Sequence, residues 1–401
     1  MFIRQIRDPH LAHYSYLLGC SQTRQALVID PGRDIDRYIH TAEAAGLEIV
    51  ATAETHVHAD YVSGARELAE RYVSRLYLSG EGRPEEGYTW LQDGDYEAEL
   101  VRDGATFRVG QVELQAMHTP GHSPEHLCFL VFDRSSGLTE PVAVASGDCV
   151  LIGDVGRPEL LTSAESERQS ATEDLYRSLQ RFLELPEFLQ LWPAHHHGCS
   201  ETAISTVGYE KRTNRGLLAA QKSRETLNEI VRQEPVEPLA YFERLHQLNR
   251  QGPPLLGALP EPRALAAEEL EALLHLPGAV VLEVSRSREE FMLGHFPGTL
   301  FTPLGESFPR LVGSMVQPDE RIYLLADAGR VDEAVGDLVR IGLDRIAGYI
   351  APETLCDYLE SDGTRLRSKV IRFTPAGAKK PLQDAGAPIF RRALSGQHVS
   401  S

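Results

Sequence analysis

The chain has 401 residues, which at roughly 150 residues per domain is too long for one ordinary domain and suits two or three. Its 42% hydrophobic residues are typical of a globular protein and exclude a disordered or collagen-like one. With 40 Lys and Arg against 58 Asp and Glu, the net charge is −18, which argues against a nucleic-acid partner because such binding needs a basic surface. The 15 His residues, most of them within the first 197 positions, are the first indication of metal chemistry.

Cysteine usage and hydropathy predict the compartment. The five cysteines are widely scattered and form no CxxC pair, so neither a disulfide framework nor a thiolate zinc site is predicted. The first 20 residues lack the continuous apolar core of a signal peptide, and no run approaches the roughly 18 apolar residues of a membrane span. We therefore expect a cytoplasmic protein with no membrane partner.

The first 250 residues read as one α/β domain. Short β-like runs alternate with turns, and they predict strands over residues 26–30, 48–52, 112–117, 127–132 and 142–145. From Thr172 the pattern becomes helical, with Leu175, Leu179 and Phe182 at helical spacing, and it resumes over 224–248. Closely spaced Pro and Gly then predict a linker over 251–263.

A second, smaller α/β domain is predicted over residues 264–363. Its pattern predicts a helix over 266–274, a strand over 279–284, a strand over 322–325, a helix over 332–342 and a final apolar run over 346–350. The tail, 364–401, carries eight Lys and Arg residues against one acidic residue, Asp384. We expect this basic tail to lie against its own acidic protein or a neighbouring subunit, within a homo-oligomer such as a dimer or tetramer.

Four short motifs follow β-like runs in the first domain. They are THVHAD (55–60), TPGHS (119–123), SGD (146–148) and PAH (193–195). Each motif places a His or Asp directly after a strand, where short turns can point several ligands at one centre. Four such turns together predict a metal site.

In this order the motifs resemble the signature of the metallo-β-lactamase superfamily, which implies an αββα sandwich with metal at one sheet edge. Its hydrolases usually hold two metal ions, the second bound partly by a His where Tyr61 stands here. A neutral phenol is a poor ligand, so we expect one metal ion. The resemblance implies a 2-His-1-carboxylate set, typical of mononuclear Fe(II) sites, formed by His56, His122 and Asp148. It also implies four supporting residues: His58, Asp60, Tyr61 and His195.

The segments GDVGRPEL (153–160) and STVGYEKRTN (205–214) resemble persulfide dioxygenases of the branch fused to rhodanese-like modules. This resemblance implies one Fe(II) per chain and the oxidation of a low-molecular-weight thiol persulfide, such as glutathione persulfide, by O2 to thiol and sulfite. Candidate substrate-binding residues are Arg157, Cys199, Tyr209, Lys211 and Arg212. The alternative role is a surface salt bridge for each charged residue and a buried structural thiol for Cys199.

Segments within 281–298 resemble the landmarks of a rhodanese domain. In active rhodaneses, the loop after the central strand begins with the nucleophilic Cys. Here that loop contains Ala326, Asp327, Gly329 and Arg330, with Ala326 at the cysteine position. We therefore expect this domain to be catalytically inactive. Residues 373–389 resemble the start of another rhodanese repeat, so the tail is either a truncated third domain or a chance likeness.

Two other functions compete with the dioxygenase. One is a zinc-dependent thioester hydrolase of the glyoxalase II type, which requires a second metal ion and is therefore disfavoured by Tyr61. The other is a non-enzymatic sulfur carrier or regulatory protein, for which loss of a ligand such as His122 would leave function intact.

Overall fold

The computed structural model describes residues 1–83, 87–158, 165–195, 205–233, 239–293 and 295–355. The chain divides into two compact units, Met1–Gly257 and Ala258–Ser401, at a point inside the predicted linker. The predicted basic tail, residues 364–401, lies outside the described residues. Among the described helices, none combines the length and the apolar character that crossing a membrane requires.

The first unit is built on two six-stranded sheets. One has the order β1-β2-β3-β4-β5-β6 and consists of β1 (Phe2–Asp8), β2 (His13–Cys20), β3 (Gln25–Ile29), β4 (Glu48–Ala53), β5 (Arg75–Ser79) and β6 (Ala98–Val101). The other has the order β12-β11-β10-β9-β8-β7 and consists of β7 (Thr106–Val109), β8 (Val112–His118), β9 (Leu127–Asp133), β10 (Ala143–Gly147), β11 (Gln190–Pro193) and β12 (Ser205–Thr206). Five of these, β3, β4, β8, β9 and β10, confirm the strands predicted from the sequence.

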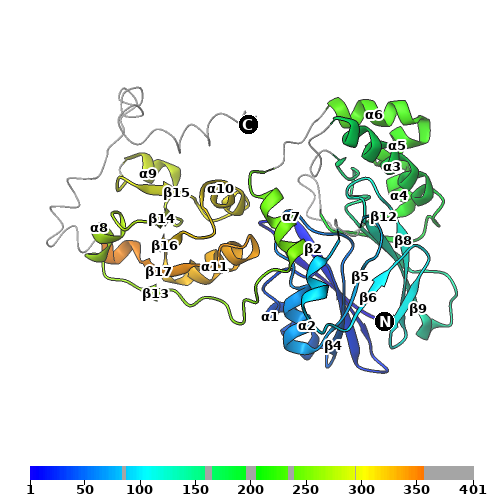
Figure 1. Ribbon diagram of the computed structural model, residues 1–401, viewed down its shortest axis with the longest axis horizontal. Coiled ribbons are helices and arrows are strands. Elements are labelled where there is room, and N and C mark those ends of the chain that lie inside the picture. Colours follow the sequence, from blue (N-terminus) through cyan, green and yellow to red (C-terminus); the bar gives the residue numbers. More distant parts are fainter. Residues whose placement is uncertain (84–86, 159–164, 196–204, 234–238, 294, 356–401) are drawn as a thin grey trace. The chain divides into compact units, whose positions relative to one another are not determined.

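The two sheets face each other, and helices cover their outer faces (Figure 1). The core between the sheets contains Leu27 and Tyr77 from the first sheet together with Phe129 and Trp192 from the second. On the outside of the first sheet lie α1 (Asp36–Ala44) and α2 (Ala65–Tyr72). On the outside of the second lie α3 (Glu165–Leu183), α4 (Val207–Thr213), α5 (Arg215–Lys222) and α6 (Arg224–Gln233). These four layers form the predicted αββα sandwich.

Two helices differ from their predicted limits. The helix α3 begins at Glu165, earlier than the predicted Thr172, because its first turns are polar and show no apolar periodicity. The helical pattern over 224–248 is divided between α6 and α7 (Phe242–Gln251), with residues 234–238 between them outside the description. Two short 3-10 helices, η2 (Thr89–Asp93) and η3 (Arg134–Ser136), lie within connections of this unit.

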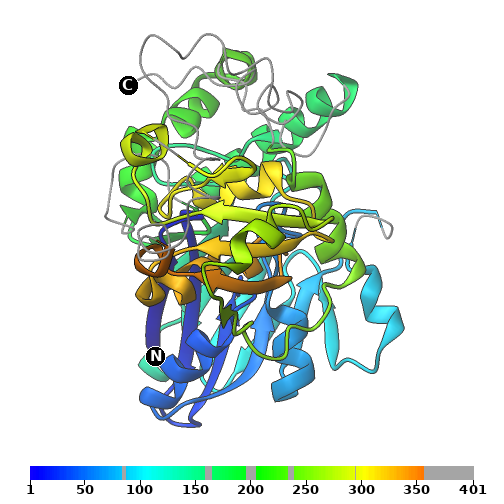
Figure 2. The same cartoon turned by 90° about the vertical axis from the view of Figure 1, so that its left-hand side faces the viewer.

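The second unit contains a five-stranded, all-parallel sheet with the order β13-β17-β16-β14-β15 (Figure 2). Its strands are β13 (Arg263–Ala264), β14 (Ala279–Glu283), β15 (Thr299–Phe301), β16 (Arg321–Leu325) and β17 (Ile346–Ile350). Its helices are α8 (Glu269–Leu273), α9 (Arg288–Leu293), α10 (Phe308–Met315) and α11 (Val331–Arg340), with the 3-10 turn η5 (Ala328–Arg330) before α11. The predicted strands over 279–284 and 322–325 and the helix over 332–342 are confirmed.

Core packing in the first unit predicts that two phenylalanines contribute differently to the free energy of unfolding. Phe129→Ala removes a fully buried ring from between the sheets and should lower the free energy of unfolding by about 3–5 kcal/mol. Phe188→Ala, at a side chain that is 62% exposed, should change it by no more than about 0.5 kcal/mol. Chemical denaturation followed by fluorescence reports on this unit, since Trp90 and Trp192, the chain's two tryptophans, lie there. Equal losses in both variants would contradict this packing.

Candidate metal centre

The candidate ligands meet because several strands end at one edge of the sandwich. In the second sheet, β8 and β10 both pair antiparallel with β9 and therefore run in the same direction, and β11 runs parallel to β10. His122, Asp148 and His195 follow the carboxyl ends of these three strands. His56 follows the carboxyl end of β4 in the first sheet. The centre therefore forms where loops of the two sheets approach each other.

His56, His122 and Asp148 form a compact, buried group that could hold a metal ion. One ligand atom from each lies within 4.8 Å of the others. The Nε2 atoms of His56 and His122 lie 3.8 Å and 3.5 Å from Oδ2 of Asp148. Ligand atoms bound about 2.1 Å from a central ion lie about 3–4 Å apart, so this spacing fits one ion held by all three residues. Two imidazoles and one carboxylate suit a divalent transition metal.

Asp30 fixes the tautomer of His56. The Thr55 hydroxyl donates to Oδ2 of Asp30 at 2.9 Å, so it accepts the hydrogen bond that joins it to Nδ1 of His56, also 2.9 Å. The proton of His56 is therefore on Nδ1, and Nε2 keeps its lone pair for a metal. Burial and the neighbouring His58 lower the pKa of His56 well below its ordinary value, which favours the same neutral form.

Asp148 is positioned by a buried histidine and by a glycine. Burial lowers the pKa of His126 to about 3, so its neutral ring accepts the Asp148 backbone N–H at Nε2 (3.0 Å). The opposite nitrogen, Nδ1, then donates to Thr119 at 2.9 Å. A Cβ atom at Gly156 would lie 2.1 Å from the Asp148 carbonyl oxygen and 2.9 Å from Cβ of His122. Only glycine lets this segment approach two of the ligands so closely.

His195 bridges two carboxylates. Its Nδ1 lies 2.7 Å from Oδ1 of Asp148, and its Nε2 lies 2.7 Å from Oδ2 of Asp60. Burial alone would lower the pKa of His195, but the charges of Asp148 and Asp60 outweigh burial and raise it well above the ordinary value. His195 therefore orients Asp148 from the side away from His56 and His122.

Tyr61 is completely buried beside the metal group. Its ring lies 4.1 Å from that of His13 and 4.5 Å from that of His58, measured between centroids. Its hydroxyl points to the Asp30 carbonyl oxygen at 3.4 Å. His58 is turned to the same residue, with Nε2 3.2 Å from Oδ1 of Asp30. The phenol thus occupies this position with a hydrogen bond to backbone rather than as a metal ligand.

The predicted substrate-binding residues have local partners. Arg157 is buried and pairs with Asp154 at 2.8 Å. Lys211 donates to the Leu185 carbonyl oxygen at 2.6 Å, and Arg212 pairs with Glu187 at 2.7 Å. Tyr209 is 62% exposed on α4, and Cys199 lies outside the described residues. Of this set, Arg157 lies nearest in sequence to the metal group, directly after Gly156.

The loop predicted to be a degenerate rhodanese loop lies at the carboxyl end of β16 in the second unit. Ala326 is fully buried, and the backbone N–H of Asp327 donates to the Ser285 hydroxyl at 2.8 Å. Arg330 pairs with Glu333 at 2.9 Å, and Gly329 lies directly before Arg330 in η5. Ala326 carries no group capable of nucleophilic attack.

Four buried residues near the centre were missed from the sequence. Asp30 is the last residue of a predicted strand, much as the candidate ligands follow theirs, so its position was a usable signal. No local signal marked His13, Glu125 or Asn249, because these residues lie outside the four motifs and come near the centre only in the folded chain. Glu125 accepts the backbone N–H of Val57 at 2.8 Å, between the two histidines of the HxH motif.

The comparisons with known families agree with this geometry. The sequence profile of the metallo-β-lactamase superfamily matches residues 9–282, well over half of the chain. The chain therefore belongs to the metallo-β-lactamase superfamily.

Three relatives illustrate the range within it. The crystal structure of a metallo-β-lactamase from Staphylococcus aureus is 32% identical and superposes with a TM-score of 0.78, covering 88% of this chain and 98% of that one. The mitochondrial persulfide dioxygenase ETHE1 of Bos taurus is 29% identical over 223 residues, which are 53% of this chain and 75% of the relative. A probable metallo-hydrolase of Burkholderia pseudomallei is also 29% identical, over 53% of this chain and 80% of its own length. Similarity thus extends to both dioxygenases and hydrolases.

The hydrogen bond from Nδ1 of His56 to the Thr55 hydroxyl predicts how removing that hydroxyl changes metal affinity. Thr55→Val removes the group that fixes the His56 tautomer and should weaken metal binding about 10–100-fold. Thr52→Val is the matched control, because Thr52 is equally buried but bonds to Ser74 instead. Competition with a chelator measures both affinities. Equal affinities in the two variants would show that the hydroxyl does not support the ligand.

Proposed function

We propose that the first unit is a mononuclear Fe(II) persulfide dioxygenase acting on a low-molecular-weight thiol persulfide such as glutathione persulfide. The observation that carries the proposal is the 2-His-1-carboxylate group of His56, His122 and Asp148, beside which Tyr61 takes the place of a further ligand. Such a group leaves coordination positions open and is typical of non-haem Fe(II) oxygenases. The relationship to a persulfide dioxygenase supports the same activity.

The proposed reaction converts a persulfide, O2 and water into a thiol and sulfite. Both atoms of O2 and the oxygen of water end on the outer sulfur, the sulfur–sulfur bond breaks, and the inner sulfur leaves as the thiol. The outer sulfur supplies the four electrons that reduce O2, and protons are released with the sulfite. Bound Fe(II) would make O2 reactive and would hold the reactants close together. The chain's residues would keep His56 neutral through Thr55 and Asp30, and would orient Asp148 through His126 and His195.

A zinc-dependent hydrolase of the glyoxalase II type is the second candidate. It is favoured by the similarity to a probable metallo-hydrolase and by the proximity of Asp60 and His195, which could contribute to a second metal position. Against it, Tyr61 donates its hydroxyl proton to a backbone carbonyl and fills the space with a buried ring. A hydrolase site built on these residues would therefore lack one ligand of a complete two-metal site.

For the second unit we propose a rhodanese-like module without sulfurtransferase activity, serving as a docking or dimerisation surface. The parallel sheet and the position of Ala326 at the end of a central strand support it. Asp327 also places a carboxylate next to the position where a persulfide anion would form.

The first prediction concerns His122. His122→Ala should abolish O2 uptake with glutathione persulfide and remove bound iron, since one of three ligands is lost. His40→Ala, at an exposed histidine of α1, should retain both. An oxygen electrode and metal analysis provide the readouts. O2 uptake by His122→Ala at the rate of the unaltered protein would refute the dioxygenase and favour a non-enzymatic role.

The second prediction concerns sulfur transfer. The full-length protein given thiosulfate and cyanide should form thiocyanate no faster than a protein-free reaction, because position 326 has no thiol. A colorimetric thiocyanate assay measures this. Protein-dependent thiocyanate formation that persists in His122→Ala would mean that the second unit has an active nucleophile elsewhere.

A further inference from the structure

The loop that carries His56 and His58 forms no regular secondary structure between residues 54 and 62. A buried loop must still pair its backbone N–H and carbonyl groups. Several of these groups bond to buried side chains from distant parts of the chain. Asp30 accepts the N–H of Thr55 at 2.7 Å, and Glu125 accepts the N–H of Val57 at 2.8 Å. The second half of the loop depends on a third side chain.

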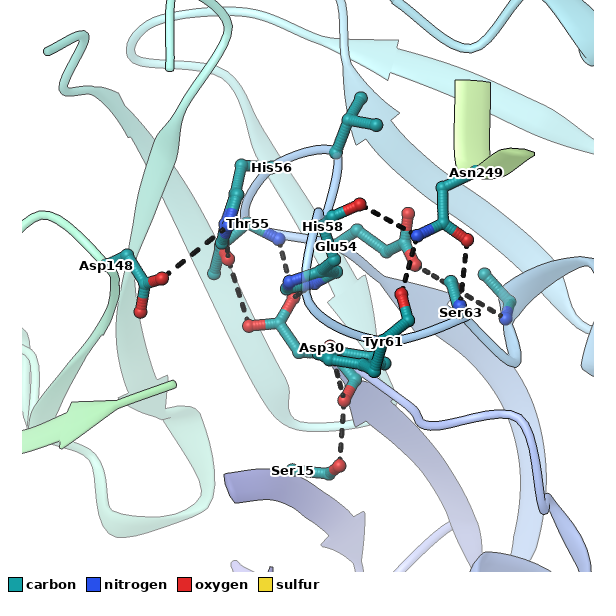
Figure 3. A network of polar contacts seen from close by, with 12 residues as sticks. Ser15, Asp30, Glu54, Thr55, His56, His58, Tyr61, Ser63, Asp148 and Asn249 are labelled. Carbon is teal, nitrogen blue, oxygen red and sulfur yellow. Dashed lines mark hydrogen bonds and ion pairs between the residues drawn. The ribbon is translucent and has the colours of Figure 1, made fainter. Parts of the chain in front are cut away.

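That side chain is Asn249, on the buried face of α7 (Figure 3). Its Nδ2 donates to the carbonyl oxygens of His58 (2.8 Å) and Tyr61 (2.7 Å). Its Oδ1 accepts the backbone N–H of Ser63 at 2.9 Å. Two carbonyls at one end and an N–H at the other fix the orientation of the amide, since only Nδ2 has protons to donate. One amide thus satisfies three backbone groups of the loop.

We propose that Asn249 is a positioning residue of the metal centre. The two carbonyls that it binds belong to His58 and Tyr61, and Asp60 lies between them. The carboxylate of Asp60 bonds to His195, which bonds in turn to the ligand Asp148. Through this series of contacts, α7 positions the carboxylate of Asp148. It also holds Tyr61 in its buried position. The inference rests on metal binding by the first unit and not on the reaction proposed above.

The end of α7 is anchored separately. Thr89 donates to the Arg250 carbonyl oxygen at 2.9 Å, and Arg66 donates to the carbonyl oxygens of Gly252 and Pro253. The carboxylate of Glu67 accepts the N–H groups of Leu256 and Gly257. These contacts hold the helix and the following segment without bonding to residues 54–63. A variant at one of these contacts therefore tests how α7 docks without removing a hydrogen bond to the loop.

The test compares Asn249→Asp with Thr89→Val in the full-length chain, using Co(II) as the metal. Asn249→Asp keeps the shape of the side chain but presents a carboxylate oxygen to two carbonyl oxygens. It should weaken Co(II) binding about tenfold and shift the visible absorption bands of the bound ion. Thr89→Val removes one hydrogen bond to α7 and should lower Tm while leaving both Co(II) properties unchanged.

Asn249→Ser, which replaces the amide with a single hydroxyl on a shorter side chain, gives the same comparison where Asn249→Asp does not fold. The proposal is overturned when the Asn249 variants lower Tm as Thr89→Val does but keep the Co(II) affinity and absorption bands of the unaltered protein. None of these readouts requires persulfide turnover, so the result is independent of the proposed activity.

Discussion

The carboxylate of Asp30 accepts hydrogen bonds from the loop that carries His56 and His58, and the rest of the centre depends on it. Its two oxygens bond to the backbone and hydroxyl of Thr55 and to the ring of His58. Its backbone carbonyl receives the hydroxyls of Ser15 and Tyr61. Asp30 adopts a left-handed backbone conformation, φ 52°, which is uncommon for a residue with a side chain. Strain of this kind persists where the surrounding contacts hold it in place.

This arrangement bears on which reaction the centre can support. With Nε2 of His56 unprotonated and Asp148 held by His126 and His195, three candidate ligand atoms lie within 4.8 Å of one another. Tyr61 is buried between the imidazole rings of His13 and His58, and its hydroxyl donates to a backbone carbonyl oxygen. The same αββα scaffold supports hydrolases and dioxygenases, and the residues around the ligands, rather than the fold, distinguish them.

Much of the first unit could be predicted from local sequence. The motifs at the ends of β8, β10 and β11 indicated where the candidate ligands meet, because these strands run in the same direction in one sheet, and the motif after β4 adds His56 from the facing sheet. The sequence could not indicate Asn249. In α7 it follows Leu245 by one helical turn, so it lies on the face where an apolar residue is expected. Its partners are close to 190 positions away, and only the folded chain brings them together.

The identity and number of the bound ions test the account most directly. Protein purified without added metal, with O2 excluded, should contain one iron per chain, and the iron should be lost together with any persulfide-dependent O2 uptake when a chelator removes it. Two zinc ions per chain, with cleavage of a glutathione thioester and no O2 uptake on glutathione persulfide, would contradict the single-metal account and establish the hydrolase.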